Sequence, residues 1–163
     1  MTLELFFLRH AIAHESGSPN YTEMTRPLTE EGIEKMILEA KGMKKLGIEF
    51  DSILSSPLTR AQQTAEIVKK HLLFEGKIET EILLAPGGSF PALLKKMRAT
   101  KKKKILLVGH EPSLSLWIQE LLGFAPKNLV EMKKGALCHL VLQGETATLK
   151  SFLPPRVLRQ CAG

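Results

Sequence analysis

The chain has 163 residues, of which 44% are hydrophobic and 25% are charged, and its formal net charge is +6. This composition excludes a disordered or fibrous chain and predicts one globular domain spanning residues 1–163, whose modest positive charge favours an anionic ligand. The first residues include the acidic Glu4 and no basic region typical of a leader, and the sequence has no CxxC pair and no apolar stretch near the roughly eighteen residues of a membrane span. We therefore expect a cytoplasmic protein without a leader and without a membrane partner.

The first predicted element is an apolar run at residues 5–8, which leads directly into Arg9 and His10. The run is short, rich in aromatic residues and without a helical period, so it predicts a buried strand. Ligands of open α/β sheets bind beyond the carboxyl ends of the strands, which makes Arg9 and His10 candidate site residues. Taken alone, Arg9 could equally mark the point where the strand meets water, and His10 could be an ordinary loop histidine.

A polar segment follows and ends at Thr29, whose hydroxyl can cap a helix that begins with two glutamates. Apolar residues then recur at helical spacing: Ile33, Met36, Ile37, Ala40, Met43 and Leu46. This pattern predicts an amphipathic helix that ends near Gly47 and packs on the sheet.

Residues 51–55 predict a second strand, and Ser55-Ser56-Pro57 predicts the start of a helix, with a capping hydroxyl and a proline in the first turn. The inner face of this helix is a stripe of small and apolar residues: Ala61, Thr64, Ala65, Val68 and Leu72. Arg60 lies in the first turn, where it can reach the same edge of the sheet.

Residues 78–84 predict a third strand and residues 90–97 a third helix, and seven lysines or arginines lie between positions 95 and 104. Basic residues at a helix C-terminus complement its dipole, and no aromatic residue is interleaved to stack on bases, so we expect no nucleic-acid partner. Residues 105–109 then predict a buried strand. His110 follows this strand, as Arg9 and His10 follow residues 5–8.

The remaining segments predict a helix over residues 114–122, a hairpin of strands at residues 136–142 and 146–152, and a basic tail that starts at Pro154. No linker or repeat marks a second domain. Strands that alternate with helices and close with a hairpin predict an α/β fold, a three-layer α/β/α sandwich around a mixed, mostly parallel sheet.

Two of the predicted strands end in histidine, and their ends share one crevice if the strands are neighbours. That crevice would hold four donors and almost no acceptors: Arg9, His10, Arg60 and His110. Guanidinium groups grip phosphoryl oxygens, and free amides at helix starts attract a dianion. A neutral imidazole can attack phosphorus, while a second imidazole, held positive by the phosphate, stabilises the transferring group. These two arginines and two histidines together predict phosphoryl transfer.

Four motifs in chain order resemble the histidine phosphatase superfamily, which is phosphoglycerate mutase-like, and within it the SixA-type phosphohistidine phosphatases. The motifs are Leu8-Arg9-His10-Ala11, Arg26-Pro27-Leu28-Thr29, the segment from Ser55 to Thr64, and Val108-Gly109-His110-Glu111-Pro112. The resemblance implies a phosphatase in which His10 is transiently phosphorylated. It also implies that Arg9 and Arg60 bind the phosphoryl group and that His110 completes the pocket.

Two further residues near these motifs have open roles. The resemblance makes Arg26 a candidate substrate-binding residue at the pocket rim, and anchoring of the loop is an equal alternative. His10 and His14 are four positions apart, which on a helix would allow joint metal ligation, but they follow a strand and lack the glutamate of an HExxH motif. We therefore expect neither a metal nor another cofactor.

The sequence offers no evident general acid, since Glu79 and Glu81 fall in or beside a predicted strand. A missing acid matters less for phosphohistidine, which leaves as a readily protonated imidazole, than for an ester that leaves as an alkoxide. We therefore expect a phosphohistidine-bearing protein as substrate and partner. The alternatives are a phosphomonoesterase acting on a small phosphate ester and, as a non-enzyme, a basic binding module.

Overall fold

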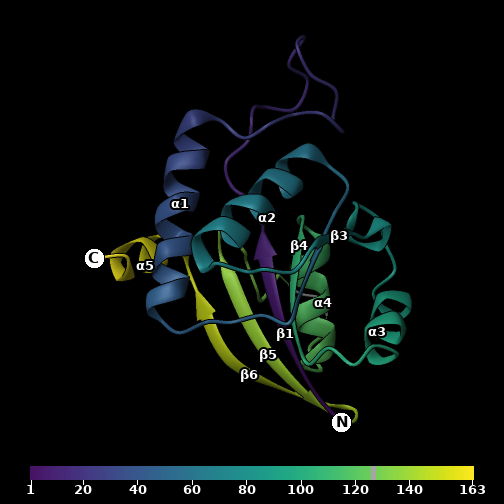
Figure 1. Cartoon of the computed structure of the whole chain (residues 1–163). Coiled ribbons are helices and arrows are strands. Elements are labelled where there is room, and N and C mark those ends of the chain that lie inside the picture. Colours follow the sequence, from purple (N-terminus) through teal and green to yellow (C-terminus); the bar gives the residue numbers. More distant parts are fainter. Residues whose placement is uncertain (126–127) are drawn as a thin grey trace.

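The computed structural model describes residues 1–125 and 128–163, which form a six-stranded sheet covered by helices (Figure 1). The strands are β1 (Thr2–Arg9), β2 (Ser52–Ser55), β3 (Ile78–Thr80), β4 (Lys104–Gly109), β5 (Leu137–Gln143) and β6 (Thr146–Leu153). Their order across the sheet is β3-β2-β4-β1-β5-β6. The first four pair in parallel, while β5 runs antiparallel to both β1 and β6. The mixed, mostly parallel sheet with a C-terminal hairpin is therefore confirmed.

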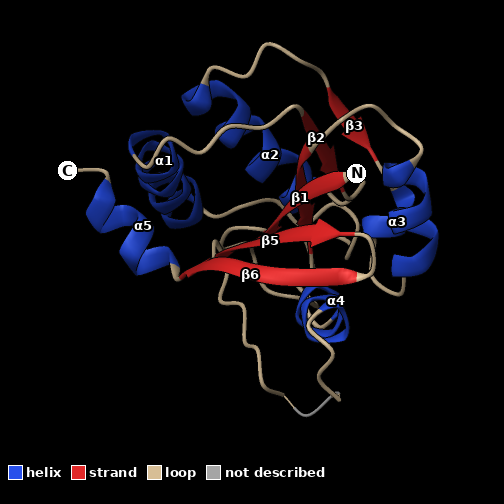
Figure 2. Ribbon diagram, turned by 90° about the horizontal axis from the view of Figure 1, so that it is seen from below, coloured by secondary structure: helices blue, strands red, loops and turns tan. Residues whose placement is uncertain are grey.

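Helices lie on both faces of the sheet and give the predicted three layers (Figure 2). One face carries α1 (Glu30–Lys45), α2 (Thr59–Leu72) and α5 (Pro155–Cys161), and the other carries α3 (Phe90–Arg98) and α4 (Ser113–Leu121). Successive strand residues point to opposite faces, so in β1 Phe6 packs in the α1–α2–α5 core while Phe7 packs against α3 and α4. The central strands are buried on both sides, as their continuous apolar sequences predict.

The start of α1 agrees with the sequence, because the Thr29 hydroxyl accepts a hydrogen bond from Gly32 N at 3.0 Å. The buried face of α1 is narrower than the predicted stripe of apolar residues. Met36, Ala40 and Met43 are buried, whereas Ile33 and Leu46 are 36% and 47% exposed. Ile33 lies in the first turn of α1, and Leu46 is its C-cap residue.

Several predicted elements differ from the structure. The strand predicted over residues 78–84 ends at Thr80, because the Glu81 side chain accepts from Leu83 N and starts a 3₁₀ turn, η1 (Ile82–Leu84). The basic tail is the helix α5, which buries Leu158 against α1. The second helix begins at Thr59, two residues beyond Pro57.

The described helices have no membrane span among them, since none is both long and apolar enough to cross a bilayer.

Candidate active site

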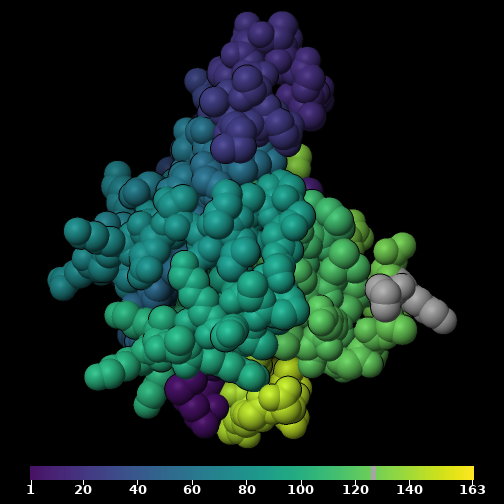
Figure 3. Space-filling view, turned by 90° about the vertical axis from the view of Figure 1, so that its right-hand side faces the viewer, coloured from purple at the N-terminus to yellow at the C-terminus, as the bar shows by residue number. Residues whose placement is uncertain are grey.

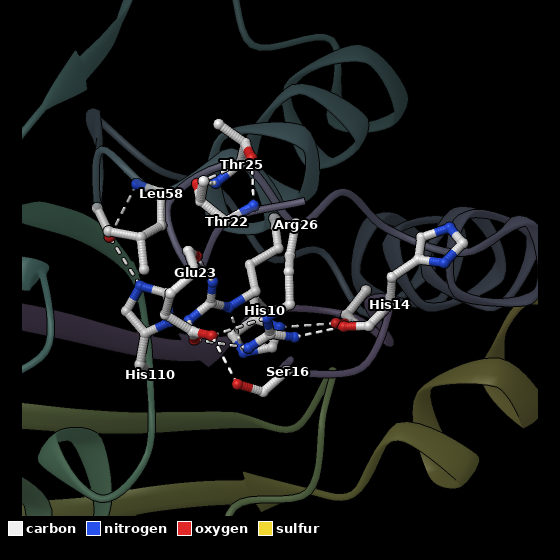
Figure 4. A network of polar contacts seen from close by, with 12 residues as sticks. His10, His14, Ser16, Thr22, Glu23, Thr25, Arg26, Leu58 and His110 are labelled. Carbon is white, nitrogen blue, oxygen red and sulfur yellow. Dashed lines mark hydrogen bonds and ion pairs between the residues drawn. The ribbon is translucent and has the colours of Figure 1, made fainter. Parts of the chain in front are cut away.

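The site forms where β1 and β4 end side by side. Arg9 of β1 is in register with Gly109 of β4, and His10 N donates to Gly109 O at 3.1 Å. The next residues of the two strands, His10 and His110, therefore emerge at the same edge, with ring centroids 5.2 Å apart and an interplanar angle of 51° (Figure 4). Rings this close can contact one phosphoryl group, as the sequence predicts.

Arg60 reaches this pair from the first turn of α2. Its Nε donates to His10 Nε2 at 3.3 Å, and the residue is 3% exposed. Thr64 fixes this part of α2 to the end of β1, because its hydroxyl accepts from Ala11 N at 3.0 Å and donates to Arg60 O at 2.7 Å. The arginine and the first histidine are thus held by one short chain of hydrogen bonds.

The hydrogen bonds of His10 determine its tautomer. Nδ1 lies 2.7 Å from Ala11 O, an acceptor only, so Nδ1 carries the proton. Nε2 accepts from Arg60 and therefore holds the lone pair. Burial lowers the pKa of His10 to about 3, and the positive charges of His110, Arg60 and Arg9 act in the same direction. His10 is neutral at neutral pH, with a nucleophilic nitrogen facing the guanidinium.

His110 is 2% exposed and pairs with Ser56, whose Oγ lies 2.7 Å from His110 Nε2. Burial lowers the pKa of His110 to about 4, with nearby Arg60 and Arg26 adding to the effect. Its Nδ1 is buried and has no hydrogen-bond partner among the described residues. In Figure 4 this side of the ring faces the cluster around His10. An unsatisfied ring nitrogen beside a second imidazole leaves a position for a ligand oxygen.

Arg9 stands at the side of the pocket, next to the segment before β5. Its Nη1 donates to Met132 O at 2.8 Å, while its buried Nε has no partner among the residues that the structure describes. The charge of Arg9 is close enough to contribute to the lowered pKa values of His10 and His110.

Arg26 comes from the loop between β1 and α1, which projects from the body of the molecule (Figure 3). Its Nη1 donates to His14 O at 2.6 Å, and its Nη2 pairs with the Glu23 carboxylate at 2.8 Å. The guanidinium thus ties the loop together, as the anchoring alternative predicts. Its charge is also close enough to lower the pKa values of Arg60 and His110.

Glu23 is a site residue that the sequence did not single out. Arg60 Nη1 donates to Glu23 O at 2.7 Å, and Arg60 Nη2 contacts the Glu23 carboxylate at 3.0 Å. The hydrogen bond from Arg26 is the main reason why the pKa of Glu23 falls to about 2. An ionised carboxylate is therefore paired with Arg60, at the group that an anionic substrate would bind.

Ser56, Thr64 and Lys134 were also missed as site residues. Ser56 and Thr64 were interpreted only as a helix cap and as part of a helix stripe. Lys134 lies in a loop without periodicity, so no sequence signal marked it. Burial and the neighbouring Arg9, Arg26 and Arg60 lower the pKa of Lys134, which places its charge at the same pocket.

The His10–His14 pair does not form a joint ligand set. The His14 ring points away from His10 in Figure 4 and lies against Tyr21, with ring centroids 5.2 Å apart. Over residues 1–125 and 128–163, no group of three His, Cys, Asp or Glu side chains is arranged to hold a metal ion.

Known proteins and solved structures are similar to this chain in sequence and in fold. The family model of the histidine phosphatase superfamily (branch 1) matches residues 5–83. An uncharacterised protein of Picosynechococcus sp. is 36% identical over 148 residues, which cover 85% of this chain and 84% of that protein. Phosphohistidine phosphatase SixA of Escherichia coli is 27% identical over 122 residues, which cover 73% of this chain and 74% of SixA. A solved structure of protein histidine phosphatase SixA complexed with tungstate has a TM-score of 0.83 at 24% identity, covering 96% of this chain and 99% of that chain.

Proposed function

The chain belongs to the histidine phosphatase superfamily, and we propose that it removes the phosphoryl group from phosphohistidine on another protein, with His10 as the nucleophile. The observation that carries this proposal is the state of His10, which is neutral, with its proton fixed on Nδ1 and its lone pair on Nε2. A buried imidazole in this state can attack phosphorus without first losing a proton.

The first step transfers the phosphoryl group to the enzyme. The lone pair of His10 Nε2 forms a bond to phosphorus while the bond from phosphorus to the substrate imidazole breaks. The leaving nitrogen keeps the bonding electron pair and takes up a proton from solvent water, so the substrate histidine is released as a neutral imidazole. In the second step water attacks phosphorus, the bond to Nε2 breaks, and inorganic phosphate leaves. His10 then returns to its starting tautomer, because Ala11 O still holds the Nδ1 proton.

Arg9, Arg60 and His110 would stabilise the negative charge on the transferring phosphoryl oxygens. Arg60 must give up its hydrogen bond to His10 and its ion pair with Glu23 when substrate binds. A bound dianion raises the pKa of a nearby imidazole, so His110 would become protonated and donate from Nδ1. Arg26 would contribute charge from the pocket rim as a substrate-binding residue.

The carboxylates near the site favour a substrate whose leaving group needs little acid catalysis. Glu23 has a pKa of about 2 and is ionised at neutral pH. Burial opposes ionisation of Glu81, but hydrogen bonds from Lys96 and Leu83 N outweigh it and hold the pKa of Glu81 below its ordinary value. Neither group can give a proton readily, which suits an imidazole leaving group better than an alkoxide.

The second candidate is hydrolysis of a small phosphate ester. Burial raises the pKa of Glu111, the residue that follows His110, despite a hydrogen bond from Ser115 at 2.8 Å. A carboxyl whose pKa is raised and that directly follows His110 in the sequence is the observation that favours ester cleavage. In either case we propose a cytoplasmic protein, whose free cysteines, Cys138 and Cys161, suit a reducing compartment.

The substrate class is tested by measuring kcat/KM on a phosphohistidine protein, a phosphohistidine peptide and a panel of phosphate esters, with His10→Ala as the control for contaminating phosphatases. We expect the phosphohistidine substrates to exceed every ester by at least about tenfold, because an alkoxide leaving group needs a proton that neither Glu23 nor Glu81 gives readily. Higher kcat/KM on one ester would favour the second candidate. No hydrolysis of any substrate would contradict both.

A further inference from the structure

A cavity of about 350 Å³ opens beside the phosphoryl pocket, between α1, α5 and the segment that leads into β5. Six charged residues line it: Arg9, Lys35, Glu39, Lys133, Lys134 and Arg159. Five of them are basic and one is acidic. The volume is within the range of small-ligand sites and is large enough for a side chain of another protein.

Two of these basic residues already have partners. Arg159 pairs with Glu39 at 2.6 Å, and Lys35 pairs with Glu31 on the same helix. Lys133 and Lys134 have no carboxylate within 4.0 Å in the part of the chain that the structure describes. The cavity therefore has two lysines whose charge is not balanced by an acidic side chain.

Glu39 offers little repulsion to a bound anion. Burial raises the pKa of Glu39 to about 7, although Arg159 opposes the shift, so the carboxyl is only partly ionised near neutral pH. The charge that remains faces the Arg159 guanidinium. The net charge of the residues that line the cavity is therefore strongly positive, and a bound anion would be attracted.

The lysine segment is held in place. Gly135 has φ +85°, and a Cβ on it would lie 2.2 Å from Glu39 Oε2, so a glycine is required where the segment passes this buried carboxyl. Gly135 N donates to Arg9 O at 3.0 Å, and Ala136 N donates to Lys133 O at 2.8 Å. These contacts join the segment that carries the two lysines directly to the strand end that carries Arg9.

Arg9 belongs to the phosphoryl pocket and also lines the cavity, so the two spaces are neighbours. The positive charges of Arg9, Arg26 and Arg60 all act on Lys134, whose pKa is lowered first by burial and then by them. A second anion beside a bound phosphoryl group would relieve the mutual repulsion of these cations.

We propose that the cavity binds an acidic side chain of the substrate protein, an aspartate or glutamate near the phosphorylated residue, through Lys133 and Lys134. This inference rests on the proposed function, because it specifies the protein substrate of the same site. The enzyme would then select phosphohistidine segments that carry a carboxylate at a fixed position from the phosphoryl group.

The test uses phosphohistidine peptides of one neutral sequence with a single glutamate placed two or one residues before, or one or two residues after, the phosphohistidine. We expect one or two of these positions to raise kcat/KM of the wild type at least about tenfold over the neutral peptide, mainly through KM, and the gain to shrink as salt rises. The double variant Lys133→Gln/Lys134→Gln should reduce this preference to less than about threefold. The matched control, Lys101→Gln/Lys102→Gln, removes the same charge from exposed residues before β4 and should keep the preference.

The outcomes separate the inference from the function on which it rests. If the wild type hydrolyses acidic and neutral peptides equally, or if the double variant keeps the full preference, the inference is overturned while the proposed function stands. If the preference falls equally in the control, net charge and not the cavity is responsible, which also overturns it. Failure of the wild type to hydrolyse any phosphohistidine peptide, with activity on esters, would contradict the proposed function and the inference together.

Discussion

Arg60 Nε donates its hydrogen bond to the one ring nitrogen of His10 that has a lone pair, at a distance of 3.3 Å. The contact orients the imidazole and also covers its nucleophilic atom. A phosphoryl oxygen that takes over the Arg60 donor would free Nε2 at the moment when phosphorus arrives next to it. The arginine can therefore bind the substrate and release the nucleophile in a single exchange of partners.

The two pocket histidines should stay neutral at pH values where an ordinary imidazole, with a pKa of about 6.5, is protonated. Burial lowers their pKa values to about 3 for His10 and about 4 for His110, so the neutral form persists as the pH falls. A ¹⁵N NMR titration should show no protonation of either ring between pH 7 and 5. Added inorganic phosphate should shift the His110 signals toward the protonated form. Midpoints near 6.5 without phosphate would contradict the described environment.

Replacing Arg60 by alanine should lower kcat about 10²–10³-fold, the loss typical of one preorganised donor to a developing charge. Arg60→Lys should recover little of the loss, because a lysine cannot donate to His10 and a phosphoryl oxygen from one planar group. The matched control is Arg98→Ala, an exposed arginine whose carboxylate partner is Glu145 at 3.4 Å. Steady-state kinetics of the three variants check this prediction, and equal losses at Arg60 and Arg98 would contradict it.

Replacing Glu23 by glutamine should strengthen inhibition by inorganic phosphate about two- to tenfold. The Glu23 carboxylate pairs with Arg60 at 3.0 Å and must be displaced by an anionic ligand, whereas the neutral amide competes less. The inhibition constant for phosphate measures the effect, and Glu145→Gln, which removes a partner of the remote Arg98, is the matched control. Weaker inhibition in Glu23→Gln would mean that Glu23 supports the binding of the anion and does not compete with it.

The lysine run at residues 101–104 should not contribute to catalysis. Lys104 begins β4 and His110 follows its other end, so the run lies at the opposite end of this strand from the pocket, about 20 Å away at the rise of a strand. The hydrogen bonds that the structure describes for the run are made by its backbone; the amides of Lys103 and Lys104 donate to Asp51 Oδ2 at 2.9 Å, and Asp51 N donates to Lys104 O at 2.7 Å. Changing all four lysines to glutamine should leave kcat/KM within about twofold on ester and protein substrates. A loss on protein substrates alone that shrinks with salt would show that the run steers them.

The sequence was sufficient to predict the sheet and to predict that the four candidate residues lie at one end of it, because each lies where a simple local rule applies. Apolar runs mark β1 and β4, parallel strands end at one edge, and the residues after them must meet there. The serine-proline segment places Arg60 at the start of a helix facing the same edge. These rules involve only neighbours along the chain and the usual pairing of parallel strands.

The missed features depend on contacts between distant segments. Glu23 lies in a loop without periodicity, and only the folded chain brings it onto Arg60, which is 37 residues away. Lys134 joins the pocket because Gly135 passes close to Glu39 of α1. The strand predicted to reach residue 84 ends early because the Glu81 side chain accepts from Leu83 N and starts η1, and the same carboxylate also pairs with Lys96 of α3.

The central claim is that His10 Nε2 carries the phosphoryl group during turnover, and rapid quench with ³²P-labelled substrate tests it most directly. Label should appear on the protein within one turnover, resist base and be lost in acid, as expected for phosphohistidine, and peptide mapping should place it on His10. His10→Ala should trap none, while His14→Ala should trap as much as the wild type. Full turnover without labelled protein, or label at another residue, would contradict the account.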